Sequence, residues 1–495
     1  MDETMPGPDT SNLLTAGQAE PAEVSKAIKR EQSPSIEIVH PKLTVFQTCA
    51  IVVSSVGGSG LFVAMSTIMR TSGSVGAMLI VVLISGLLNY SLANCFAEVA
   101  VQLPKAGGPY FFIKQVFGDF PAFLFLWGFF FLIVTPIWGF LAYTSAIYIV
   151  QLFFPGCQPP DEAVKLLAIV ILALTILANC MYLPFVTKLQ MILTSAKIVA
   201  MLIIIIAGIV ALIDGEGMSY TMIFEGSSTQ PGDYAVSILA GTFLFGGWQL
   251  ITFLLEEMDS PEKNLPKTLS ISFTIAITLS ELVVAAYFVV LSPQEVLSGD
   301  AVAVMFMNKI YRPMSPVISI FVTATSIGSL NAVVLAQSRM VSTAARLGHM
   351  PEIMSFQSSS YNMPWPAIFG VSLISLVMLL LLEASTIIKM TSFMATVMGL
   401  AVLLCLLALR VRKPDAHRPL QVWLGTAIFQ LVLNVATLLM SIYQEPRDIG
   451  LLALFMLAGT PVYIVCVRWS KPKEVEKLIG SLNLSLQKLL LLKKM

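Results

Sequence analysis

Two glycine clusters lie inside apolar stretches of the chain that should otherwise form continuous membrane helices. The first, SSVGGSGLFV, covers residues 54–63, and the second, GTFLFGGWQL, covers residues 241–250. Glycine is about 1 kcal/mol less favourable than alanine inside a helix, and every backbone group within a membrane needs a partner. The clusters therefore predict two helices broken at mid-membrane, each with free N–H and C=O groups.

Broken helix ends suit a substrate that carries both charges. The positive N-terminal end of a half-helix can hold a carboxylate, and freed carbonyl groups can hold an ammonium. An amino acid presents both groups, and glycine lets them approach the backbone closely. Small residues also occur where membrane helices pack, but this alternative explains one cluster more easily than two. A phosphate-binding loop is disfavoured, since no strand precedes the glycines and no Gly-Lys-Ser/Thr follows.

Side chains that would support an enzyme are missing from the apolar stretches. His40, His349 and His417 lie outside them, and no nucleophile has a base beside it. No CxxC pair or histidine cluster indicates a metal site. The 29 Lys and Arg balance the 29 Asp and Glu, so nothing suggests a nucleic-acid partner. We expect neither enzymatic activity nor a cofactor.

The composition indicates an all-α polytopic membrane protein. Of 495 residues, 56% are hydrophobic and 12% are charged, whereas soluble domains contain about 25% charged residues. The apolar stretches are continuous, not alternating, which excludes a barrel, and about 20 apolar residues cross a bilayer. The expected 12 transmembrane helices cover residues 44–70, 76–103, 121–153, 163–183, 190–213, 234–258, 268–292, 314–344, 365–383, 386–410, 421–442 and 450–468.

The loops predict the orientation of the chain. More Lys and Arg lie in the loops that share a side with the N-terminus, so both termini should be cytosolic. Residues 1–43 form a polar tail without a cleavable signal. The tail over 469–495 is either an amphipathic helix on the membrane surface or loosely ordered. Cys157 would then lie outside, where disulfides persist, either as an intermolecular bridge or as an unpaired loop cysteine.

A set of ordered motifs gives residues 44–470 a specific resemblance to a known family. The motifs are GGSGLF, FAEVAVQLPKAGGPYFFI, FPGCQPPDEAVK, FLFGGWQLITFLLEEMDSPEKNLPK, LSGDAVAVMF, QSRMVSTAARLGHMP and RVRKPDAHRPLQV. Together they resemble the L-type amino acid transporters. These are the light chains of heteromeric amino acid transporters, within the amino acid–polyamine–organocation superfamily.

The resemblance implies a LeuT-like 5+5 inverted repeat with discontinuous helices 1 and 6, plus two extra helices. The transporter domain over 44–468 would comprise repeat one, 44–213, repeat two, 234–410, and helices 11–12, 421–468. The implied function is sodium-independent exchange of neutral amino acids by alternating access at the plasma membrane. The implied partner is a single-pass glycoprotein heavy chain bonded through Cys157.

Site residues follow from the resemblance position by position. Ser59 and Gly60 would meet the substrate carboxylate. Phe243 and Gly246 would meet its amino group, with Phe243 as an aromatic gate. Lys197 matches the family lysine that takes the place of the sodium ion in sodium-driven relatives. A lysine inside a membrane helix is a functional candidate by default, and the alternative is snorkelling to the cytosolic surface.

The chain departs from the family pattern in the third and tenth helices. The third, LWGFFFLIVTPIWG, has one extra residue between tryptophan and proline, which rotates part of the helix by about 100°. In the tenth, Thr396 replaces a usual bulky aromatic and Ala395 is small, so the resemblance leaves the bound side chain open. Lys389 either attracts acidic substrates or snorkels. Glu256 and Glu257 either pair with cytosolic bases as a gate or end their helix in solvent.

Two other functions stay open. A facilitator or carrier of cationic amino acids or polyamines would need an acidic site in the third, sixth or eighth helix, and none lies there at mid-membrane. A sensor would bind amino acids without moving them, although nothing resembling a signalling domain is attached.

Overall fold

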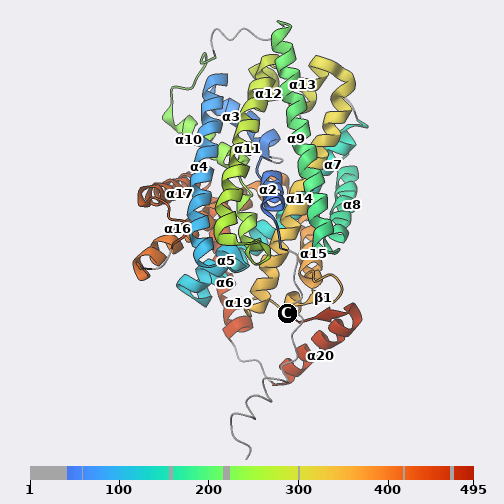
Figure 1. Cartoon of the computed structure of the whole chain (residues 1–495), viewed down its shortest axis with the longest axis vertical. Helices are drawn as coiled ribbons and strands as arrows, with labels where there is room; N and C mark the ends of the chain where they lie inside the picture. Colours follow the sequence, from blue (N-terminus) through green and yellow to red (C-terminus); the bar gives the residue numbers. More distant parts are fainter. Residues whose placement is uncertain are drawn as a thin grey trace, which may run out of the picture. The chain divides into compact units, whose positions relative to one another are not determined.

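The computed structural model describes residues 42–57, 60–154, 160–215, 223–298, 302–415, 418–468 and 473–494. This part of the chain is helical apart from one short antiparallel strand pair and one isolated bridge (Figure 1). The predicted all-α polytopic fold is confirmed. By length and composition, nine helical stretches among these residues can each cross a membrane, and α2 and α15 are shorter apolar helices.

The helices follow the predicted spans in order. The first half contains α2 (Val45–Ser55), α3 (Gly60–Ser72), α4 (Val75–Gln102), α5 (Gly108–Phe117), α6 (Asp119–Phe129), η2 (Phe130–Val134), α7 (Thr135–Gln151), α8 (Asp161–Asn179) and α9 (Leu183–Ile213). The second half contains α10 (Pro231–Leu244), η4 (Trp248–Glu257), α11 (Pro261–Val290), α12 (Pro293–Ser298), α13 (Val302–Tyr311), η5 (Arg312–Met314), α14 (Ser315–Arg346), η6 (Glu352–Ser355), β1 (Gln357–Ser358), α15 (Trp365–Leu381) and α16 (Ala384–Arg412). The last part contains α17 (Leu424–Gln444), α18 (Pro446–Leu457), α19 (Gly459–Tyr463), η7 (Ile464–Arg468), α20 (Lys473–Leu490) and β2 (Leu492–Lys493).

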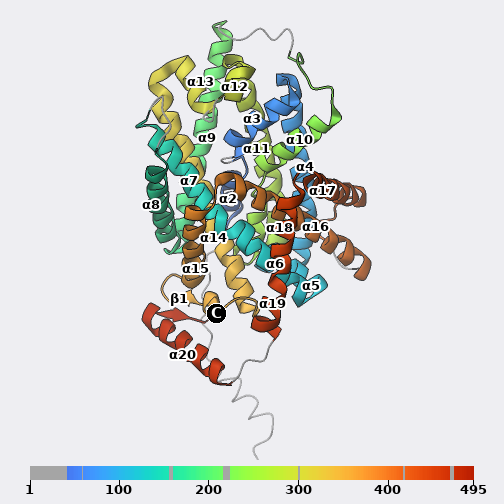
Figure 2. The same cartoon turned by 180° about the vertical axis from the view of Figure 1, so that it is seen from behind.

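The two interrupted helices lie together inside the bundle. The helix α2 packs against α9, α11, α14 and η4, and α3 packs against α10. Both views of the molecule show α2 enclosed by other helices, whereas α17 lies at the side of the bundle (Figures 1 and 2). The discontinuities predicted in spans one and six are therefore present, and they face each other.

The extra residue in the third span is taken up by a π-helical turn. The turn covers Phe130–Val134, between Trp127 and Pro136. A π turn holds one more residue than an α turn, so α6 and α7 continue as regular helix on either side of η2. The insertion is thus accommodated locally. Ile133 and Ile137 both line a cavity inside the bundle.

A buried ion pair ties α4 to α16 and to the start of α17. Glu98 is fully buried and accepts hydrogen bonds from Arg410 Nε at 2.9 Å and Nη2 at 2.6 Å. The backbone N–H of Val422 donates to the same carboxylate at 2.7 Å. A buried carboxylate is tolerated when its partners satisfy it in this way, and the pair holds α17 against the bundle.

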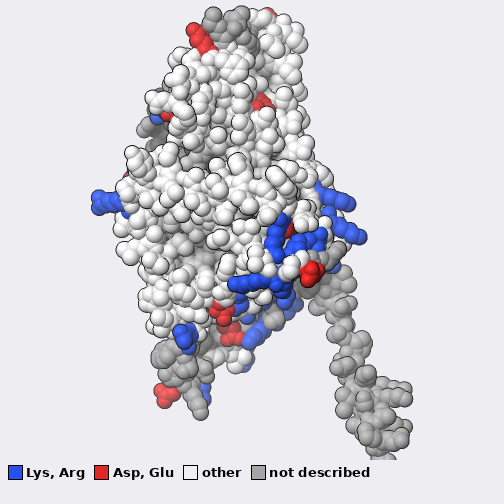
Figure 3. Space-filling model, turned by 90° about the vertical axis from the view of Figure 1, so that its left-hand side faces the viewer, with Lys and Arg blue, Asp and Glu red and all other residues white. Residues whose placement is uncertain are grey.

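The distribution of charged side chains on the surface fits a membrane protein. Figure 3 shows a face almost without charged side chains over its upper part, with Lys and Arg gathered lower down.

The C-terminal tail forms the helix α20, and β2 pairs with β1, so the loosely ordered alternative is wrong for residues 473–490. Its position on a membrane surface and the orientation of both termini stay predictions.

Candidate functional site

The first break separates α2 from α3. The helix α2 ends at Ser55, Val56 is extended, and Gly57 has a φ of +62°, in the left-handed region that favours glycine. The N–H of Gly57 donates to the carbonyl of Leu244 at 2.9 Å. The freed backbone of the first break is therefore bonded directly to the end of α10.

The second break separates α10 from η4. Its Gly247 has a φ of +96°, and a Cβ there would lie 2.9 Å from the Cβ of Ser55 and 3.1 Å from its carbonyl oxygen. The side-chain Oε1 of Gln249 accepts a hydrogen bond from the N–H of Gly247 at 3.1 Å. Glycine is thus required here both by the backbone conformation and by the close approach of α2.

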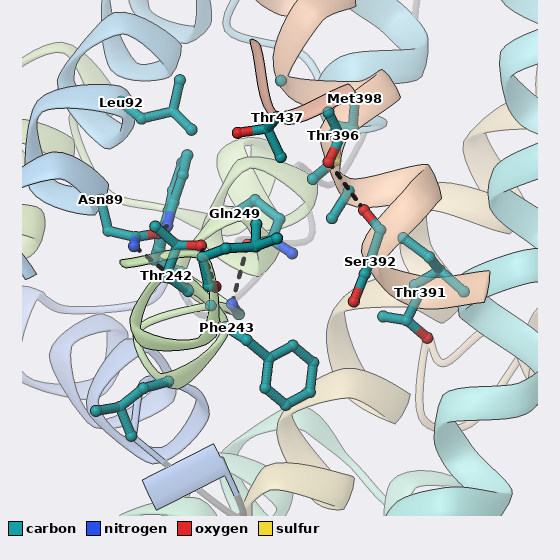
Figure 4. A pocket seen from close by; sticks show the side chains of 18 of the residues that line it. Asn89, Leu92, Thr242, Phe243, Gln249, Thr391, Ser392, Thr396, Met398 and Thr437 are labelled. Carbon is teal, nitrogen blue, oxygen red and sulfur yellow. Dashed lines mark hydrogen bonds between the residues drawn. The ribbon is translucent and has the colours of Figure 1, made fainter. Parts of the chain in front are cut away.

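A cavity of about 560 Å³ opens beside the two breaks (Figure 4). Such a volume lies in the range of small-molecule sites. Residues of α2, α3, α4, η2, α7, α10, η4, α14, α16 and α17 line it. No described lining residue is Asp, Glu, Lys, Arg or His. An uncharged wall favours substrates whose side chains carry no net charge.

Two of the four residues predicted to bind substrate line the described cavity. Phe243 and Gly246 line the cavity, as do Ala395 and Thr396 of α16. Gly60 is the first residue of α3. Ser59 and Cys157 both lie outside the described residues.

Lys197 points into the bundle from α9. The residue is 3% exposed, and its Nζ donates to the carbonyls of Val53 at 2.7 Å and Val56 at 2.5 Å. These carbonyls belong to the C-terminal end of α2, which attracts positive charge. The snorkelling alternative is therefore wrong for this structure.

A serine of α14 binds the same end of α2. The hydroxyl of Ser329 donates to the carbonyl of Ser54 at 2.9 Å, and the Nζ of Lys197 lies 3.5 Å from that oxygen. These contacts link α9 and α14 through the end of α2.

Sequence reasoning missed the amide side chains around the cavity. Asn89 of α4 accepts from the indole N–H of Trp248 at 3.3 Å and donates to the carbonyl of Thr242 at 3.3 Å. Gln337 of α14 accepts from the indole N–H of Trp138 at 2.7 Å. Amides within apolar helices are a usable signal, because membrane helices bury such groups against partners.

Glutamates at the end of η4 pair with α14. Glu257 Oε1 lies 2.8 Å from Nε of Arg339, and Glu256 lies 3.2 Å from Arg346. The Arg339 side chain is 9% exposed, so the pair is mostly shielded from solvent. Both glutamates therefore pair with bases, although Glu256 is exposed and Glu257 half-buried. Their role as a gate stays a prediction.

The chain is similar to known proteins over most of its length. A family model described as amino acid permease matches residues 43–466. The large neutral amino acids transporter small subunit 2 of Mus musculus is 33% identical over 452 residues, which cover 90% of this chain and 85% of that protein. The Asc-type amino acid transporter 1 of Homo sapiens is 31% identical over 446 residues, covering 89% and 85%. The cystine/glutamate transporter of Pongo abelii is 30% identical over 431 residues, covering 87% and 86%.

Proposed function

Because the chain belongs to the amino acid permease family, among the light chains of heteromeric amino acid transporters, we propose that it exchanges neutral amino acids without sodium by alternating access. The observation that carries the proposal is the pair of helix breaks joined from Gly57 to Leu244 beside an uncharged cavity. It acts as a transporter and not as an enzyme.

The helix ends supply the proposed grip on the substrate. The carboxylate would meet Ser59 and Gly60 at the positive N-terminal end of α3. The ammonium would meet the C-terminal end of α10, next to Phe243 and Gly246. Phe243 would cover the bound amino acid as an aromatic gate before one helix bundle moves against the other.

Lys197 would take the role that sodium plays in sodium-driven relatives. Its ammonium joins α9 to the end of α2, and Ser329 joins α14 to the same end. The amine is covalently attached, so binding of substrate would need no ion from solution.

The alternative of a cationic or polyamine carrier is less well supported. Such a carrier needs an acidic group facing the substrate, and the described cavity wall has none. Glu281 of α11 is absent from that wall. An acidic substrate also lacks support, because Lys389 is held by Glu445 and Asp448 at 2.8 Å each.

Exchange in proteoliposomes tests the proposed function. Vesicles with the purified chain, preloaded with unlabelled alanine, should take up labelled alanine at the same rate in sodium and in choline buffer. Uptake should fall strongly without internal amino acid. Binding without uptake would identify a sensor, equal uptake into empty vesicles a facilitator, and strict sodium dependence would refute the role of Lys197. A competition panel of the common amino acids then defines the substrates.

A heavy-chain partner is also part of the proposal. The relatives include a protein named as a small subunit, and Cys157 precedes α8 in a Pro-rich loop predicted to be external. We propose that Cys157 bonds to a single-pass glycoprotein at the plasma membrane, with both termini of this chain in the cytosol.

Replacing Cys157 with serine should abolish a reducible high-molecular-weight band on non-reducing gels of plasma-membrane fractions. The thiol is the bond-forming group, so loss should be complete. Cys466→Ser is the matched control, since Cys466 is an exposed free cysteine of η7 predicted to lie near the cytosol. A band that survives Cys157→Ser would place the bridge elsewhere.

A further inference from the structure

The central cavity extends past the helix breaks to α17, which lies outside the two predicted repeats. Its lining includes residues spaced three or four apart on one face of that helix: Gln430, Leu433, Asn434, Thr437 and Ser441. Figure 4 shows Thr437 between Leu92 of α4 and Thr396 of α16. The part of the cavity lined by Leu92, Thr396, Asn434 and Thr437 is called the α17 compartment below.

Packing accounts for one polar residue of this face. Gln430 is 1% exposed, and its Nε2 donates to the carbonyl of Leu88 at 2.8 Å and to the hydroxyl of Ser91. Both acceptors belong to α4. Gln430 therefore fastens α17 to α4.

Packing does not account for the next two polar residues. Asn434 donates from Nδ2 to the carbonyl of Gln430 at 2.9 Å, but no described residue donates to its Oδ1. The side-chain hydroxyl of Thr437 has no hydrogen-bond partner among the described residues either. Both residues are half-buried and line the cavity, so these two groups are accessible from it. These two groups are therefore available to bind a ligand that enters the compartment.

Small residues on α16 leave room at this place. A Cβ at Gly399 would lie 2.6 Å from Oδ1 of Asn434, so the glycine makes space for the amide. One turn earlier, Thr396 and Ala395 line the same cavity. The side chains of Thr396 and Ala395 are small, so they leave the compartment open toward the rest of the cavity.

We propose that the α17 compartment binds the side chain of the transported amino acid and selects a long, uncharged polar side chain such as that of glutamine. The proposal rests on the proposed function, because the head group is held at the two breaks. A carboxamide donates from its NH₂ to Oδ1 of Asn434, and its carbonyl accepts from the hydroxyl of Thr437. Glutamate has no such donor, and lysine would bring an unpaired charge into an uncharged cavity.

Glutamine and alanine exchange by variants of the purified full-length chain in proteoliposomes tests the assignment. Thr437→Val removes the hydroxyl with little change of shape. We expect the KM for glutamine to rise about tenfold, as loss of one hydrogen bond implies, with the KM for alanine unchanged because its side chain is too short to reach α17. Asn434→Leu should act in the same direction. Thr426→Val, on α17 but outside the cavity lining, should change neither value.

The outcomes separate this proposal from the function on which it rests. An unchanged ratio of the two KM values in both variants would overturn it, as would parallel loss of alanine and glutamine exchange in both. Wild-type preference for glutamate or lysine over glutamine would overturn it too. Failure of the wild-type chain to exchange any amino acid would instead contradict the proposed transport function.

Discussion

Replacing Lys197 with methionine should lower the rate of alanine exchange at least about 100-fold while the chain still inserts and folds. Methionine keeps an unbranched apolar stem of similar length but removes the ammonium. The carbonyls of Val53 and Val56 then lose a charged donor, and each such hydrogen bond contributes about 1.5–3 kcal/mol. Since about 1.4 kcal/mol corresponds to a factor of ten, loss of these bonds is enough for the expected effect.

The matched control for this variant is Lys188→Met. Lys188 lies on the same helix and is exposed, so its replacement should leave exchange unchanged. The measurement is the initial rate of alanine exchange in proteoliposomes, normalised to the amount of reconstituted protein. Exchange by Lys197→Met at the wild-type rate would show that the ammonium is not needed to hold the first break.

Replacing Gly247 with valine should abolish exchange, with a fall of about 100-fold or more. A valine at a φ of +96° is strained, at a cost of about 1–3 kcal/mol. Its Cβ would also lie 2.9 Å from Cβ of Ser55 and 3.1 Å from the Ser55 carbonyl oxygen. Backbone cannot yield as a flexible side chain can, so the second break must move away from the first.

The control for the second variant lies in the same broken helix. Gly232 is in the first turn of α10, and a Cβ there meets nothing within 4 Å. Gly232→Val should therefore exchange at close to the wild-type rate, and equal yields of monodisperse protein would show that both variants fold. If Gly247→Val exchanged normally, close contact between the breaks would not be part of the mechanism.

Local sequence was enough to predict the membrane helices and their interruptions, but not the short helices α5, α12 and α13 between them. Long apolar stretches specify membrane helices because a bilayer core needs about 20 residues, and glycine clusters specify breaks because glycine alone adopts left-handed torsions freely. Gly57 and Gly247 both have positive φ values at the predicted places. The extra residue before Pro136 followed from the resemblance to the family, although its form as a π turn did not.

Tertiary structure decided which groups meet. The hydrogen bond from Gly57 to Leu244, the ion pair of Glu98 with Arg410, and the inward direction of Lys197 join residues that are more than 100 positions apart. Periodicity cannot predict such pairs, because a helix face is defined only relative to the neighbours that cover it. For the same reason, the polar face of α17 could be read from the sequence as a spacing, but its opening into the cavity depended on how α16 and α4 pack beside it.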